Sequence, residues 1–196
     1  MSKTLLVGPL LGFEGETSTG KLLYTICFLT PPTAADCIVV VDEAEIAAEA
    51  ITTTPSGIFW RAIIPTKRKR ARHSCRYQIK TNRTVISDRW GYVAWTFWVP
   101  GTSEQPRIAY ASCNGFSDPD AITKLEKPYG MWKALRDSHE KEPFTLFLMG
   151  GDQIYADEIW HSEKRVPSIV EWTSLPRANR ISKQVSKNTE EELDRF

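Results

Sequence analysis

Two short segments in the second half of the chain combine side chains that bind metal ions in proteins. The first segment, Ala111–Gly115, contains Cys113, and the second, Gly150–Asp157, contains Asp152 and Tyr155. Thiolate and phenolate are anionic ligands that suit an iron(III)-like ion, whereas a carboxylate can bridge to a harder, oxygen-preferring ion such as Ca²⁺. The three side chains therefore form a candidate metal site.

Each of these segments follows a predicted strand. Residues Arg107–Ser112 and Phe144–Met149 have strand-like composition, and Asp120–His139 between them has the apolar spacing of a helix. Strand, helix and strand at this spacing predict a βαβ unit in a parallel sheet that is covered on both faces. Because sites in open α/β sheets form at the carboxyl ends of strands, we expect Cys113 and Asp152 to lie close together on neighbouring strands.

Taken one at a time, the three candidate ligands have structural explanations. A single cysteine is usually a buried thiol, an aspartate that follows a glycine can cap a turn or a helix, and a tyrosine can pack in a core. Their joint occurrence at two strand ends favours the metal site.

The first hundred residues have the pattern of an antiparallel β-sandwich. Short runs rich in β-branched and aromatic residues alternate with Pro, Gly and charged turns, and one stretch, Asp42–Ala50, favours a helix. Pro100–Pro106 is the best candidate for a linker. The predicted fold class is therefore mixed: a β-sandwich domain over residues 1–104, followed over residues 105–196 by the first βαβ part of an incomplete α/β domain. The predicted strands of the sandwich are Lys21–Thr30, Asp36–Val41, Gly57–Ile64, Cys75–Lys80 and Gly91–Val99.

The heptapeptide Gly-Asp-Gln-Ile-Tyr-Ala-Asp at residues 151–157, together with Ser112–Cys113 upstream, resembles the alkaline phosphatases of the PhoD type, within the calcineurin-like metallophosphoesterases. In that family a β-sandwich precedes an α/β metallophosphoesterase domain. The resemblance implies a hydrolase of phosphate mono- or diesters with a dinuclear metal centre of iron and calcium. Cys113 and Tyr155 would bind the iron, and Asp152 would bridge the two metals. Asp157 completes the motif without an assigned ligand role.

The same resemblance implies ligands that this sequence does not contain. The family's later segments supply an Asn-His pair and further His or Asp ligands, whereas the chain has no Asn-His and no His-x-His. Its three histidines, His73, His139 and His161, match no family ligand. We therefore expect the N-terminal portion of such an enzyme, with two partners: a phosphate-ester substrate and the missing C-terminal portion. The alternative is a non-catalytic β-sandwich binding module with a truncated or decayed α/β tail.

Two further motifs are interpreted as ordinary structure. Gly15–Lys21 has the spacing of a phosphate-binding P-loop, but Leu22 replaces the hydroxyl that would reach Mg²⁺, so we expect a turn between strands. Lys67–His73 is a basic cluster within residues 61–83, which hold nine basic and no acidic residues. It lies between predicted strands and lacks interleaved aromatic residues, so we expect a solvated hairpin and no specific nucleic-acid partner.

Composition excludes several other classes of protein. Hydrophobic residues make up 41% of the chain, which is enough for a core and excludes general disorder. No apolar run approaches the roughly 20 residues of a membrane span, and the N-terminus lacks a signal-peptide pattern, so we expect a cytoplasmic protein with no membrane partner. The four cysteines form no C-x-x-C pair, so apart from Cys113 we expect buried, inert thiols.

Overall fold

The computed structural model describes residues 4–113, 124–152, 166–182 and 191–192. The chain divides into two compact units, of which the first contains Met1–Ala111 with Ile122–Leu148, and the second contains Ser112–Ala121 with Met149–Phe196. Every described strand begins in the first unit. The second unit contains helices α4 (Pro167–Ser174) and α5 (Arg177–Ser182).

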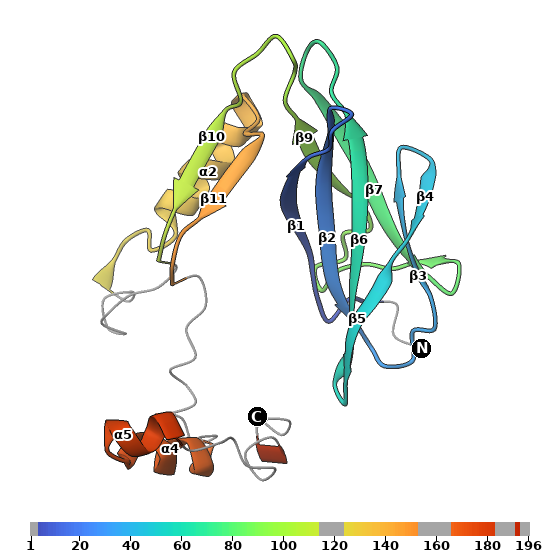
Figure 1. Cartoon of the computed structure of the whole chain (residues 1–196). Helices are drawn as coiled ribbons and strands as arrows, with labels where there is room; N and C mark the ends of the chain where they lie inside the picture. The colour runs from blue at the N-terminus through green and yellow to red at the C-terminus, as the bar shows by residue number, and fades with distance from the viewer. Residues whose placement is uncertain (1–3, 114–123, 153–165, 183–190, 193–196) are drawn as a thin grey trace. The chain divides into compact units, whose positions relative to one another are not determined.

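Two antiparallel sheets make up the N-terminal part of the first unit (Figure 1). One has the strand order β1-β2-β6-β5, and the other has the order β4-β3-β7-β8, with β9 also paired to β7. All strand pairs within these two sheets are antiparallel, which confirms the predicted β-rich fold. The strands are β1 (Val7–Glu16), β2 (Lys21–Thr30), β3 (Cys37–Val41), β4 (Ala44–Ala47), β5 (Glu49–Thr54), β6 (Gly57–Lys67), β7 (His73–Thr81), β8 (Thr84–Val85) and β9 (Trp95–Val99).

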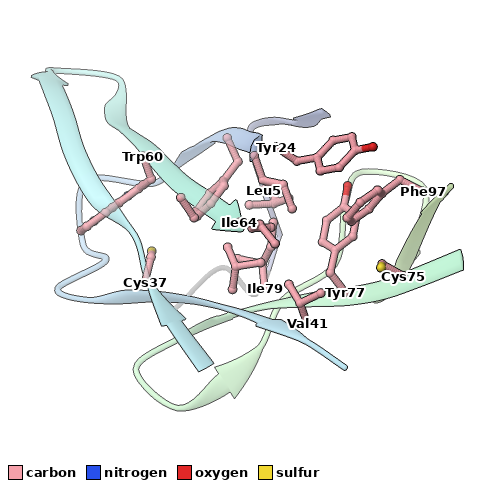
Figure 2. Packing of buried hydrophobic residues seen from close by; sticks show 14 of the residues in the cluster. Leu5, Tyr24, Cys37, Val41, Trp60, Ile64, Cys75, Tyr77, Ile79 and Phe97 are labelled. Atoms are coloured by element: carbon pink, nitrogen blue, oxygen red, sulfur yellow. The ribbon is translucent and has the colours of Figure 1, made fainter. Parts of the chain in front are cut away.

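The two sheets share one hydrophobic core (Figure 2). Side chains alternate between the faces of a strand, so β2 places every second residue, including Ile26 and Phe28, in the core. The indole Nε1–H of the buried Trp60 donates a 2.8 Å hydrogen bond to Thr30 Oγ1, which satisfies both buried polar groups. Core residues come from both sheets and include Tyr24, Val39, Ile64, Tyr77, Ile79 and Phe97.

Residues Asp42–Ala50, which the sequence predicts as helix-favouring, instead form a turn, strand β4 and the start of β5. Asp42 and Glu43 have φ angles of 44° and 75°. Positive φ at both central residues gives a two-residue hairpin turn whose twist matches the flanking strands. The helix prediction is wrong because pairing of β4 with β3 overrides the helix propensity of Ala and Glu.

The P-loop-like segment Gly15–Lys21 is a turn. Thr17 N–H donates to Lys21 O at 2.8 Å, and Gly20 N–H donates to Thr17 O at 3.0 Å. Strand β2, and not a helix, begins at Lys21. The amides of the turn are therefore not those of a helix N-terminus, and the predicted turn is confirmed.

The basic stretch forms the β6–β7 hairpin and binds the segment that follows β9. Arg68 Nη2 donates to Gly101 O at 2.6 Å, and Thr102 N–H donates to Lys69 O at 2.9 Å. A Cβ atom on Gly101 would lie only 2.5 Å from Arg70 O, so this close approach needs glycine. The hairpin is thus more than a solvated turn, because it fixes the start of the predicted linker.

A buried carboxylate organises the loop between β8 and β9. Asp88 is 6% exposed, and its Oδ1 accepts the backbone N–H groups of Trp90 and Tyr92, both at 2.9 Å. Asp88→Ala removes this acceptor, so we expect the free energy of unfolding in urea to fall by about 1–2 kcal/mol. Asp88→Asn keeps one acceptor oxygen and should lose less. Equal losses in the two variants would contradict the assigned role of Oδ1.

Strand β10 (Ile108–Ala111), helix α2 (Gly130–Lys141) and strand β11 (Leu146–Met149) follow in the predicted order (Figure 1). The helix packs on the sheet through Trp132 and Phe147, whose ring centroids lie 6.0 Å apart. Helix α2 begins at Gly130, and residues 125–129 before it are not helical, since Pro128 disfavours helical backbone in the residue before it. The predicted helix start at Asp120 lies outside the described residues.

Strand β11 is less buried than its apolar sequence suggests. Leu148 and Met149 are 47% and 56% exposed. Among the described elements, one helix packs against a two-stranded sheet, and these two side chains stay partly uncovered. Among the described residues, no helix has the length and apolar character needed to span a membrane.

Candidate metal centre

Strands β10 and β11 run parallel and bring two of the predicted ligands to one edge. Thr145 N–H donates to Arg107 O at 2.9 Å, and Cys113 N–H donates to Gly151 O at 2.8 Å. Residue numbers rise along both strands from the first bond to the second, as they do where two strands run in the same direction. The pairing therefore continues past the carboxyl ends of both strands as far as Cys113 and Gly151.

The side chains of Cys113 and Asp152 meet at this edge. Cys113 Sγ lies 3.5 Å from Asp152 Oδ2, and both residues are exposed. Their φ angles are 61° and 62°, in the left-handed region that residues other than glycine rarely occupy. This backbone turns the chain as it leaves each strand.

The distance between the two side chains suits a shared metal ion. A thiolate sulfur about 2.3 Å from a tetrahedral ion and a carboxylate oxygen about 2.1 Å from it lie about 3.6 Å apart. The observed 3.5 Å separation is close to this value. Without a cation, the Cys113 thiol donates to the carboxylate as a weak hydrogen bond. A metal ion can therefore replace the thiol proton between Cys113 and Asp152 with little movement of either side chain.

Arg107 holds the start of β10 against α2, which the sequence alone did not reveal. Its guanidinium carbon lies 4.1 Å from the centre of the Phe144 ring, and its Nη2 donates to Ser138 Oγ at 2.8 Å. These contacts hold the start of β10 against the end of α2 and against Phe144, which precedes β11. An arginine immediately before an apolar strand was the available sequence signal, but its partners lie more than 30 residues away.

The remaining candidate ligands fall outside the described residues. Tyr155, Asp157 and His161 lie in this undescribed part of the chain. The other two histidines lie elsewhere in the sequence and make no hydrogen bond or ion pair to Cys113 or Asp152 among the described residues. His73 is in β7, and His139 Nδ1 accepts the Phe144 N–H at 3.1 Å. No group of three or more His, Cys, Asp or Glu side chains suited to a metal ion occurs among the described residues. The described part thus contains two of the three predicted ligands.

The four cysteines should differ sharply in their reaction with a thiol reagent. Cys37 and Cys75 are buried, and burial raises the pKa of both thiols from 9.0 to about 11. A raised pKa leaves little thiolate at pH 8, and the thiolate is the reactive form. Cys113 is exposed. We expect one fast-reacting thiol at pH 8, absent in Cys113→Ser, and reaction of Cys37 and Cys75 only on unfolding.

Absorbance of the thionitrobenzoate released from Ellman's reagent gives these rates. Cys27 is half-buried, and burial raises the pKa of its thiol, so it should react more slowly than Cys113. A fast phase of unchanged amplitude in Cys113→Ser would show that another thiol is the accessible one.

No family model matches the chain. The chain is 27% identical over 101 residues to an uncharacterized protein of Saccharomyces cerevisiae, YGR266W. The match covers 51% of this chain and 14% of the yeast protein, so the chain corresponds to a small part of that relative's length. This similarity assigns neither a family nor an activity.

Proposed function

We propose that the chain supplies part of the dinuclear metal centre of a phosphate-ester hydrolase of the PhoD type. The observation that carries the proposal is the 3.5 Å approach of Cys113 Sγ and Asp152 Oδ2 at the carboxyl ends of two parallel strands. The strand–helix–strand order of β10, α2 and β11 supports it, since it is how such a domain begins. Tyr155, three residues after Asp152, is the proposed third ligand.

The described side chains have defined roles in this proposal. Cys113 would bind the iron-like ion as a thiolate, and Asp152 would use one carboxylate oxygen on that ion and the other on a second, calcium-like ion. Bound metals would lower the pKa of a water molecule and neutralise charge on the phosphate during in-line displacement. The exposed position of both side chains leaves room for a phosphate ester beside them.

Two or three protein ligands do not complete a two-metal site, so the remaining ligands must come from other segments. We therefore expect the 196-residue chain alone to hydrolyse p-nitrophenyl phosphate at background rates. The reading frame downstream of its gene segment should encode Asn-His and His-x-His. A protein that joins this chain to those segments should hydrolyse the ester in a metal-dependent manner.

Paired substrates then define the class of ester. p-Nitrophenyl phosphate tests monoesterase activity, and bis(p-nitrophenyl) phosphate tests diesterase activity. Metal-dependent turnover of either substrate by the joined protein supports the proposal. A downstream frame without the histidine motifs, or a joined protein without turnover, would contradict it and favour a non-catalytic β-sandwich binding module.

A further inference from the structure

A cavity at the surface of the β-sandwich is lined by residues of the β3–β4 and β6–β7 hairpins. Its volume is about 290 Å³. Val41, Ile46 and Ile64 give it an aliphatic wall, and Lys67, Lys69 and His73 give it a basic wall. None of the proposed metal ligands lines it. The cavity thus combines an apolar surface with several hydrogen-bond donors, as small-molecule sites do.

His73 is partly buried and lies in the wall of the cavity. Burial, and next the positive charge of Lys69, lower the pKa of His73. An anion bound beside the imidazole would oppose this effect and stabilise the imidazolium.

The charge of the lining favours an anion. Neither Lys67 nor Lys69 has an ion-pair partner among the described residues. Asp42 is the one acidic residue that lines the cavity, and its Oδ1 accepts the Arg76 N–H at 3.3 Å. The lining therefore has a net charge of about +1 with neutral His73 and about +2 with the imidazolium.

We propose that this cavity binds a small phosphate monoester, with the phosphate between Lys67, Lys69 and His73 and the organic group against the aliphatic wall. A phosphate dianion matches two ammonium groups and accepts several hydrogen bonds. The volume is at the lower limit of the usual range for ligand pockets, about 300–1,000 Å³, so the organic group is small. The site is independent of the metal centre.

Titration with phenyl phosphate, followed by NMR of the imidazole Hε1 protons, tests the proposal. The chain has only three histidines, so the His73 resonance can be assigned with one His73→Gln variant. The titration uses Asp152→Asn protein at fixed ionic strength, so that the outcome does not depend on the metal centre. We expect saturable shifts of the His73 resonance alone and a higher His73 pKa in the complex, because a bound dianion stabilises the imidazolium.

Two variants of the same hairpin separate a defined cavity from a diffuse basic surface. Lys69→Gln should weaken binding about tenfold, because it removes a charge-assisted hydrogen bond. Arg70→Gln removes the same charge from an exposed residue that does not line the cavity, and should change affinity less than about twofold. Inorganic phosphate, which lacks the organic group, should bind more weakly than phenyl phosphate.

Three results would overturn the proposal. One is a His73 resonance that does not respond to phenyl phosphate up to about 20 mM. Another is equal weakening by Lys69→Gln and Arg70→Gln, which would mean a diffuse basic surface. The third is equal affinity for inorganic phosphate and phenyl phosphate, which would mean that the aliphatic wall does not contribute to binding.

Discussion

Replacing Asp152 by asparagine is expected to lower phosphatase turnover at least about 100-fold in a protein that joins this chain to the remaining metal ligands. Removing a residue that only hydrogen-bonds to a metal ligand already lowers metal affinity or activity about 10- to 100-fold. A bridging carboxylate binds both ions directly, so its loss should have a larger effect. Asparagine also tolerates the left-handed backbone at this position, where φ is 62°. The substitution therefore removes the charge with little change to the turn.

Asp137→Asn is the matched control for this experiment. Asp137 lies on α2, and its carboxylate pairs with Lys133 at 2.6 Å on the protein surface. Its replacement should leave turnover within about twofold, because exposed ion pairs contribute little. Steady-state hydrolysis of p-nitrophenyl phosphate and metal analysis of both variants give the comparison. Full metal content and unchanged turnover in Asp152→Asn would contradict the assigned bridging role.

Replacing Phe28 by alanine should cause the largest loss of stability, about 3–5 kcal/mol in the free energy of unfolding. Phe28 is 1% exposed and lies in the core shared by the two sheets. Truncation removes the transfer free energy of the ring and leaves a cavity that the sandwich can only partly fill. Urea unfolding followed by tryptophan fluorescence measures the change.

Phe59→Ala is the control because it makes the same change on the next strand. Phe59 lies in β6 opposite Leu29 of β2 and is 38% exposed, on the outer face of the sheet. Its truncation should cost about 1 kcal/mol or less. Similar losses in the two variants would mean that the core does not lie where the burial pattern places it.

The alternation of apolar residues was sufficient to predict the β-rich fold. In β2 and β6, every second side chain faces the core, and this period is visible in the sequence. Local propensity failed at Asp42–Ala50, where the decisive factor was pairing of β4 with a strand that lies earlier in the chain. Such pairing is tertiary information that propensity does not contain.

The position of the candidate site could be predicted in part from the order of the strands and the helix. Parallel strands end at a common edge, so the approach of Cys113 and Asp152 follows once the strand–helix–strand order is recognised. Their left-handed backbone angles could not be predicted, because neither residue is glycine. Tyr155 lies outside the described residues, and its role as a ligand stays a prediction.

Absorption spectroscopy of the chain in excess Co²⁺ tests the central claim most directly, because thiolate ligation of Co²⁺ gives a charge-transfer band in the near ultraviolet. We predict that the band appears in the wild-type chain, is lost in Cys113→Ser, weakens in Asp152→Asn and persists in Cys27→Ser. Absence of the band in the wild type, or an undiminished band in Cys113→Ser, would contradict the assignment of Cys113 and Asp152 to one metal ion.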